Sequence, residues 1–599
     1  MSDRQRARAA AVRPARNPSL PSTWRRAADR TPWLAGAAVF AFGLLAYANT
    51  LGHGFVWDDP IWLEQKIRFY RSAADAFFEP RDFPMRQVYR PLSQLTYWLD
   101  QSVWWRNPFG FHLTSIVLHA LNGVLVLGLA SALGLATGPA VVGALLFVVH
   151  PIQPESVAWI TNRVDVLATG FVLVAILASL RPPSAWTVAI VAVASFAAAA
   201  SKETGCVVPL LLFAATATLI SRGASSARSP SWVVIAASIV GVLGYFALRP
   251  ADAGTGIAFG SLELEALVQL TGSFGYQVER LLWPIGFQPY VAAAPTDPMT
   301  LGLAASGAIV TAAGLVAPAS DGGRRRFALL WILIAAALPV VVVLADFSAT
   351  PVAEHRLYLA TVGLALLVAL TLERRPAILA SRSGVIAIGL GLVALTATTT
   401  HRNAYWRDEL TLWSAVTERV QTEPLPYLNL GLALANAGRQ AEAEPAYRRA
   451  LALAPTDVTR QRASINLGLL LVDRGALDEA QELLTQANQI APHATAYRGL
   501  GMIARRRAQV AVRAGDVTTA SAELNRARTA LDRALAINPR YYQARFTLAG
   551  VLYDAGQYRG ALAQYQRVVE LAGDTDTGRE AAAAAGELSA WLAAHPEAP

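Results

Sequence analysis

The sequence has a single cysteine and few charged residues. Cys206 lies in an apolar stretch of the 599-residue chain, which excludes a disulfide framework and a thiolate metal site. Charged residues make up only 16% of the chain and apolar residues 54%, and the mean hydropathy is positive. Because an ordinary soluble protein carries more charge than this, the composition predicts a polytopic membrane protein.

The formal net charge of +9 does not indicate nucleic-acid binding. Most of the excess positive charge lies in about the first thirty residues and in short loops between apolar segments. Basic residues at such positions determine how a membrane protein is oriented in the bilayer. We therefore expect a lipid bilayer, and no nucleic acid, as the partner of this charge.

Apolar segments of the length that a bilayer requires predict an all-α polytopic helix bundle of about eleven spans over residues 33–400. The predicted spans are 33–51, 113–134, 139–158, 164–181, 184–200, 206–221, 231–248, 299–317, 327–345, 354–372 and 383–400. The polar, basic residues 1–32 should form a disordered cytoplasmic tail. Two long outer loops, 52–111 and 250–299, contain amphipathic patterns and should cover a cavity beside the bilayer.

The arginine-rich loops predict the orientation of the spans. With the tail in the cytoplasm, every arginine cluster of the loops, such as 324–326, falls on the tail's side. The opposite side collects the candidate catalytic groups, which are Asp58, Asp59, Arg90, His112, His150, Glu155, Arg163, Asp165, Lys202, Glu203, Glu354, His355 and Arg356. Because the number of spans is odd, the segment after residue 400 should also lie outside the cytoplasm.

After residue 400 the hydrophobic period changes to that of a tetratricopeptide repeat. The first copy carries the repeat's packing positions as Tyr427, Leu430, Gly431, Leu434, Ala443, Tyr447, Ala450 and Pro455. We expect a transition helix at 401–423 and about four repeats within 424–599, the third with lengthened helices. Stacked repeats form an α-solenoid whose concave groove binds extended peptides or proteins.

Two adjacent acids, Asp58 and Asp59, follow the first predicted span in the motif GHGFVWDD (52–59). An acid beside a bilayer is costly to bury unless it is paired or functional. One interpretation is catalytic, with one acid facing a cavity. The other is structural, because an acid followed by Pro60 suits the start of a helix.

Three cations, Arg163, Lys202 and Arg356, break the positive-inside pattern on the outer side. A cation on the wrong side is better explained by an anion that it must hold than by topology. Structural alternatives remain open. Lys202 beside Glu203 fits a terminal ion pair, and Arg90 fits an anchor to lipid headgroups.

The remaining candidates also have structural alternatives. His112 and His119 lie seven residues apart on one helical face, which favours a polar stripe packed between helices. His150, Glu155 and Asp165 could bind a cation together with Asp59, but pairing of the two acids with Arg163 explains those acids equally well.

The order of the motifs resembles that of the transmembrane and tetratricopeptide-repeat protein O-mannosyltransferases and their bacterial relatives. The motifs are GFVWDD (54–59), YRPL (89–92), FHLTSIVLH (111–119), HPIQPESVAWITNRVDVLA (150–168), SKETG (201–205) and EHRLYLATVG (354–363), followed by the repeats. The resemblance implies a glycosyltransferase-C fold and an inverting enzyme. It would move a mannose-like sugar from a polyprenyl-phosphate donor to a protein or peptide acceptor, held by the repeats outside a bacterial inner membrane.

The resemblance also implies roles for the outer-side groups. Asp58 or Asp59, with Asp59 preferred, would be the general base that accepts the proton of the acceptor hydroxyl. Arg163, Lys202 and Arg356 would bind the donor phosphate. A divalent cation, Mg or Mn, could bind at Asp59 and Glu155. The supporting groups would be Arg90, His112, His150, Glu155, Asp165, Glu203, Glu354 and His355.

A different class of function remains open, namely a non-catalytic membrane scaffold whose repeats recruit envelope proteins. A scaffold has no need for acids and cations gathered on the same side of the membrane as its repeats. Their gathering therefore favours the enzyme. A polysaccharide ligase or polymerase is a third, weaker alternative.

Overall fold

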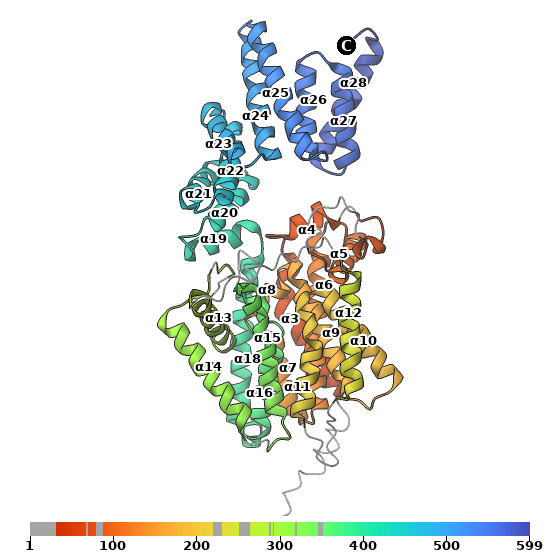
Figure 1. Cartoon of the computed structure of the whole chain (residues 1–599), viewed down its shortest axis with the longest axis vertical. Coiled ribbons are helices and arrows are strands. Elements are labelled where there is room, and N and C mark those ends of the chain that lie inside the picture. The colour runs from red at the N-terminus through yellow and green to blue at the C-terminus, as the bar shows by residue number, and fades with distance from the viewer. Residues whose placement is uncertain are drawn as a thin grey trace, which may run out of the picture. The chain divides into compact units, whose positions relative to one another are not determined.

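A computed structural model of the chain is built from helices, with no strand among the residues it describes. These are residues 32–67, 70–78, 88–219, 230–250, 264–286, 289–291, 293–317, 320–344 and 352–598. The chain divides into two compact units, Met1–Asp408 and Glu409–Pro599, whose helices Figure 1 labels. Apart from Pro32, the predicted basic tail lies outside the described residues.

The first unit, here called the membrane unit, contains the apolar helices. They are α3 (Pro32–Tyr47), α6 (Pro108–Ala132), α7 (Thr137–Val149), α9 (Arg163–Ser179), α10 (Ala185–Ser201), α11 (Val208–Thr218), α12 (Trp232–Leu248), α14 (Pro298–Val316), α15 (Arg324–Leu344), α16 (Ala360–Glu373) and α18 (Arg382–Asn403), and a short α17 (Pro376–Ala380) joins the last two. Each predicted span overlaps one of these helices. The helical fold is thereby confirmed.

Among the residues that the structure describes, five helical segments are long and apolar enough to cross a membrane. They are Trp33–Gly52, Pro108–Ala132, Ile160–Ser179, Pro298–Val316 and Arg382–Trp406. Five further apolar helices, Thr137–Val149, Ala185–Ser201, Glu203–Thr218, Trp232–Leu248 and Ala360–Glu373, are shorter. The count of eleven spans therefore stays a prediction.

Most of the apolar helices of the membrane unit share one hydrophobic core. Val39 of α3, Phe147 of α7 and Trp331 of α15 are fully buried within it. Small residues let the helices approach closely, as at Gly143 of α7, where an added Cβ would lie 2.7 Å from the carbonyl oxygen of Ala365 in α16.

The third predicted span, 139–158, is wrong in its extent because α7 ends at Val149. His150 precedes a proline, which disfavours helical backbone, and it adopts φ −65° and ψ 127°. The chain then forms two short buried helices, α8 (Pro154–Val157) and η4 (Ile160–Asn162). Residues 150–162 are thus a buried connection rather than part of a span.

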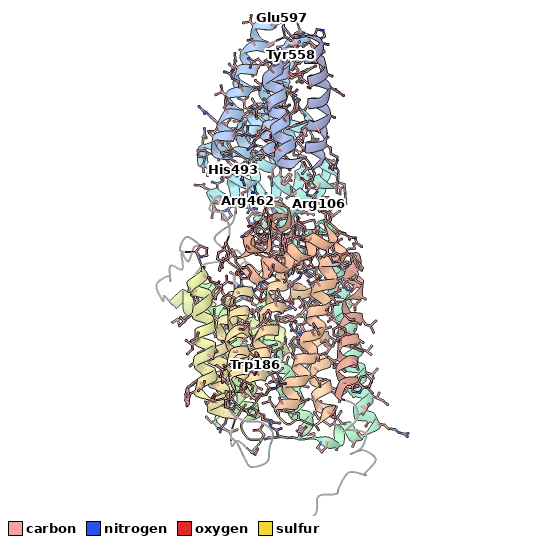
Figure 2. All side chains as sticks on the ribbon, turned by 90° about the vertical axis from the view of Figure 1, so that its right-hand side faces the viewer. Arg106, Trp186, Arg462, His493, Tyr558 and Glu597 are labelled. Atoms are coloured by element: carbon pink, nitrogen blue, oxygen red, sulfur yellow. The ribbon has the colours of Figure 1, made fainter. Side chains whose placement is uncertain are left out.

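The predicted outer loops contribute short and amphipathic helices. The first loop contains α4 (Asp59–Gln65), η3 (Ala73–Ala76) and α5 (Pro91–Trp104), and the second contains α13 (Leu264–Leu282). In Figure 1, α4, α5 and α8 lie at the same end of the membrane unit. Figure 2 shows Arg106, which follows α5, at that end, and Trp186 of α10 in the other half of the unit.

The second unit, here called the repeat unit, begins with α19 (Glu409–Arg419) and continues in antiparallel helix pairs. The pairs are α20 (Pro424–Asn436) with α21 (Gln440–Leu453), α22 (Asp457–Arg474) with α23 (Leu477–Ile490), α24 (Ala494–Arg513) with α25 (Val517–Ile537), and α26 (Tyr542–Asp554) with α27 (Tyr558–Ala572), followed by α28 (Asp576–Ala594). The third pair has helices of 20 and 21 residues, in agreement with the predicted lengthening.

Glycines at equivalent positions allow the repeat helices to pack closely. A Cβ on Gly431 would lie 2.6 Å from the ring of Tyr447, and one on Gly468 would lie 2.8 Å from Leu484. The repeated contact explains why the small residue recurs. Between the two units the predicted transition helix is divided, since α18 runs to Asn403, a 3-10 turn η7 spans Ala404–Trp406, and α19 begins at Glu409.

Candidate active site

The two acids of the first loop have different surroundings. The carboxylate of Asp59 is fully buried, and it accepts the backbone N–H of Val56 at 3.0 Å on Oδ2 and that of Thr161 at 2.8 Å on Oδ1. Burial raises the pKa of Asp59 to about 7, against the opposing effect of these two N–H donors. Asp59 therefore joins the first loop to η4.

Asp58 lines a cleft beside this junction. The cleft has an empty volume of about 400 Å³ and is lined by Asp58, Trp62, Arg90, Ser93, Gln94, Tyr97, Trp159, Thr161, Asn162 and Val164. Asp58 occupies the N-cap position of α4, yet its side chain makes no capping hydrogen bond to that helix. The geometry favours Asp58 over Asp59 as the acid that faces a substrate, which reverses the preference drawn from the sequence.

Trp57, which precedes the two acids in the chain, has a strained backbone conformation. Its φ of 56° is unusual for a bulky residue and costs about 1–3 kcal/mol. Its ring stacks on Trp159 with centroids 4.6 Å apart and planes 9° apart, and Trp159 stacks on Trp406 at 5.4 Å and 11°. Stacking of this kind stabilises the loop in the conformation that separates Asp58 from Asp59.

Two of the predicted cations form ion pairs that differ from the expected ones. Lys202 donates to both carboxylate oxygens of Asp165 at 2.7 Å, while Arg90 forms a forked pair with Glu203, at 3.0 Å from Nε and 2.9 Å from Nη2. The adjacent Lys202 and Glu203 thus have separate partners. Arg90 is half-buried at the cleft rather than only an anchor for the loop.

The charges of Arg90, Lys202 and Arg356 act on one another. Burial lowers the pKa of Lys202, Asp165 opposes this shift, and the positive charges of Arg90 and Arg356 add to it. Burial likewise lowers the pKa of Arg356, and Arg90 contributes to that decrease. These three residues form the cation cluster of the membrane unit.

Arg163 is fully buried and its guanidinium is bound by the protein. Nη1 forms an ion pair with Asp100 at 2.5 Å, Nε donates to Ser115 at 3.0 Å, and Nη2 donates to the carbonyl oxygen of Phe111 at 2.6 Å. The ring of Tyr97 lies 5.1 Å from the guanidinium carbon. This environment favours a structural role for Arg163 over the predicted phosphate contact, and it does not pair with Glu155 or Asp165.

A second buried polar cluster lies around the segment η6 (Glu354–Leu357). Glu155 accepts from His355 at Nδ1 (2.7 Å) and at the backbone N–H (3.2 Å). Burial raises the pKa of Glu155 well above its usual value and lowers that of His355 well below. Burial thus disfavours the charged form of each side chain of this pair. Glu354 forms ion pairs with Arg402 and, at 3.6 Å, with Arg280.

The predicted histidines are packing residues. His150 Nε2 donates to the carbonyl oxygen of Leu281 in α13 at 3.1 Å, and burial lowers the His150 pKa to about 4. His112 contacts the carbonyl oxygen of Gly54 at 3.4 Å. His119 lies seven residues further along the same face of α6, and its ring nitrogens bond to the hydroxyl of Tyr358 and to the carbonyl oxygen of Val148. These contacts agree with a polar stripe between helices.

The predicted cation at Asp59 and Glu155 fits this arrangement poorly. Both oxygens of Asp59 accept backbone N–H groups, and both oxygens of Glu155 contact His355. Among the described residues, no group of three or more His, Cys, Asp or Glu side chains is gathered for a metal ion. These donors are occupied by protein contacts that a metal ion would have to replace.

Several residues of the site carried no signal that we used in the sequence. They are Asp100, Trp57, Trp159, Arg280, Arg402 and Trp406. Asp100 could have been proposed from the sequence, because an arginine buried in the protein, as Arg163 is, requires a carboxylate as its counter-charge. Trp57 and Trp159 occur in two separate motifs and Trp406 lies outside the motifs, and only the fold brings the three tryptophans together.

Known proteins match both units. Family models described as tetratricopeptide repeat match residues 424–457 and 511–588. The human protein O-mannosyl-transferase TMTC3 is 32% identical over 167 residues, covering 25% of this chain and 18% of that protein. Human protein O-mannosyl-transferase TMTC1 is 35% identical over 164 residues, covering 26% of this chain and 18% of its own length. The chain thus spans about a fifth of the length of these relatives.

A longer match is the Caenorhabditis elegans protein O-mannosyl-transferase F38B6.6, which is 24% identical over 444 residues, covering 70% of this chain and 62% of that protein. Among solved structures, the tetratricopeptide-repeat protein YrrB is 22% identical and covers 30% of this chain and 82% of its own, with a TM-score of 0.21. The relatives are those that the motif order predicts, and the repeats are confirmed by the family models.

Proposed function

We propose that this chain is an inverting membrane glycosyltransferase that moves a mannose-like sugar from a polyprenyl-phosphate donor to a hydroxyl of a protein or peptide. The observation that carries the proposal is the cleft in which the carboxylate of Asp58 and the guanidinium of Arg90 line the same space. An acid and a cation are the two groups that such a transfer needs. Relatives named O-mannosyl-transferases support the reaction class.

In the proposed mechanism the acceptor hydroxyl attacks the anomeric carbon of the donor sugar. The hydroxyl oxygen forms the new glycosidic bond while its proton passes to the carboxylate of Asp58. The bond between the anomeric carbon and the phosphate oxygen breaks, and its electron pair leaves with the polyprenyl phosphate. Attack opposite to the leaving group inverts the anomeric configuration without a covalent enzyme intermediate.

The cation cluster supports the proposal that the leaving group is the phosphate of the donor lipid. Arg90 pairs with Glu203 and Lys202 pairs with Asp165, and the positive charges of Arg90, Lys202 and Arg356 act on one another. Positive charges gathered in a low-dielectric environment would stabilise the phosphate as its charge develops.

The repeat unit would hold the acceptor. Tetratricopeptide repeats stack into a groove for extended chains, and the repeat matches cover parts of residues 424–588. Because the basic loops predict a cytoplasmic tail, we place the cleft and the repeats on the outer face of a bacterial inner membrane.

The test is transfer from mannosyl polyprenyl phosphate by purified wild-type and Asp58→Asn proteins. The substitution keeps the shape of the side chain and removes its ability to accept a proton. Turnover should fall by about 10²- to 10⁴-fold while donor affinity is nearly unchanged. The control is Asp408→Asn. The side chain of Asp408 is 46% exposed and does not line the cleft, so this variant should retain turnover. Undiminished transfer by Asp58→Asn refutes the base, and a wild-type protein that neither binds the lipid nor transfers sugar supports the scaffold.

A further inference from the structure

The cleft contains a buried hydrogen-bond donor that the protein does not satisfy. Trp159 is 6% exposed and lines the cleft together with Asp58. Within the part of the chain that the structure describes, its indole Nε1 has no hydrogen-bond partner. Buried polar groups are nearly always paired, so an unpaired one at a binding cleft points to a ligand atom.

Among the described residues, the Thr161 hydroxyl of the cleft lacks a hydrogen-bond partner as the Trp159 indole does. Five other polar side chains of the cleft differ from these two because their hydrogen bonds stay within the protein. The bonds are Ser93 Oγ to the carbonyl oxygen of Ser201 at 2.9 Å, Gln94 Nε2 to that of Val88 at 3.4 Å, Tyr97 Oη to that of Thr161 at 2.8 Å, Asn162 Nδ2 to that of Glu155 at 3.2 Å, and Arg90 to the Glu203 carboxylate. These groups build the walls of the cleft, and the Trp159 indole is left to act on what enters it.

Trp159 is also held in a fixed orientation. Trp57 and Trp406 stack on its ring, and His355 packs against the ring edge-on with centroids 6.2 Å apart. The next turn of the chain is fixed by the bond from the Thr161 N–H to Asp59. A donor held in this way does not have to reorganise when it binds an oxygen atom, which favours selectivity.

We propose that Trp159 is a specificity-determining residue that donates its indole N–H to a hydroxyl or ring oxygen of the donor sugar. This inference rests on the proposed function. The indole is uncharged and donates only, so it suits a neutral sugar oxygen, whereas the cations Arg90, Lys202 and Arg356 suit the phosphate. The position of Trp159 beside Asp58 places this contact near the reacting carbon.

The experiment compares Trp159→Phe with Trp406→Phe in full-length protein in lipid nanodiscs. Both substitutions replace an indole of the same stack by a smaller ring, but Trp406 does not line the cleft. Affinity is measured for mannosyl polyprenyl phosphate and for polyprenyl phosphate without sugar. Trp159→Phe should bind the mannosyl lipid about 5- to 10-fold more weakly and the bare lipid unchanged. Trp406→Phe, which keeps an aromatic ring beside the Trp159 indole, should lose less affinity for the mannosyl lipid than Trp159→Phe and should bind the bare lipid unchanged.

Each other outcome rejects the inference. Equal losses of affinity for the mannosyl lipid in the two variants would assign the effect to ring stacking. A loss of affinity for the bare lipid would assign the Trp159 contact to the phosphate. A change confined to the KM for the acceptor would assign the contact to the acceptor. If Trp159→Phe does not fold, the wild type is measured with mannosyl lipids that lack one hydroxyl or the ring oxygen. One of these should lose 5- to 10-fold in affinity, and the absence of any loss rejects the contact. Wild-type protein that binds neither lipid refutes the proposed function itself.

Discussion

Replacing Asp59 by Asn should remove a pH dependence of stability that the wild-type protein shows. Burial raises the pKa of Asp59 from 3.8 to about 7, so the protonated acid is favoured in the folded chain relative to the unfolded one. Its contribution to the free energy of unfolding is fully present below about pH 4 and is lost as the pH rises through 7. A shift of this size corresponds to about 4 kcal/mol.

The substitution has a cost of its own, which also follows from the structure. The two carboxylate oxygens accept the N–H groups of Val56 and Thr161. An asparagine amide keeps one oxygen and turns an NH₂ group toward the other N–H. One buried donor loses its acceptor, which costs about 1–3 kcal/mol. Asp59→Asn should therefore be less stable than the wild type near pH 4 and as stable or more stable at pH 8.

The measurement is unfolding followed by tryptophan fluorescence between pH 4 and 8, with protein in detergent micelles. Asp58→Asn is the matched control, because this acid lies next in the chain but lines the cleft and is half-buried. It should keep the wild-type pH dependence. If Asp59→Asn kept the wild-type slope, or if Asp58→Asn abolished it, the assignment of the raised pKa to the buried acid would be refuted.

Two further predictions concern the buried arginine and the topology. Arg163→Ala should destabilise the protein by about 3–5 kcal/mol, because it leaves the carboxylate of Asp100 buried without its partner, and lipid-phosphate affinity of the folded fraction should not change. Thermal unfolding and lipid binding check this, and weaker lipid binding at unchanged stability would restore the phosphate role. Reporter enzymes that work only in the cytoplasm should be active when fused after Arg326 and inactive after Pro455, and activity at Pro455 would overturn the predicted orientation.

The helices and repeats could be predicted because their signals are local. Apolar segments and the spacing of small residues in each repeat depend on neighbours within one or two turns. The extent of the third span was predicted wrongly although the sequence carried a signal, since 139–149 is apolar whereas 150–158 reads HPIQPESVA. The proline after His150 carried the missing signal.

The ion pairs could not be predicted from adjacency. Neighbouring side chains point in different directions, so Lys202 reaches Asp165 and Glu203 reaches Arg90, which is 113 residues away. The same divergence separates Asp58, at the cleft, from Asp59, in the protein interior. Only the packing of the helices decides which member of an adjacent pair faces a substrate.

The break in the positive-inside pattern singled out three cations in the sequence but did not define the role of each. Arg163, Lys202 and Arg356 look alike in the sequence, since each follows a buried loop or begins a helix. In the fold, the charge of Arg163 is balanced by Asp100 and its donors are bound by protein oxygens. Lys202 and Arg356 share a cluster with Arg90, and the positive charges of this cluster act on one another. Because like charges in a buried cluster repel one another, an incoming phosphate would be stabilised more by this cluster than by Arg163, whose charge Asp100 balances.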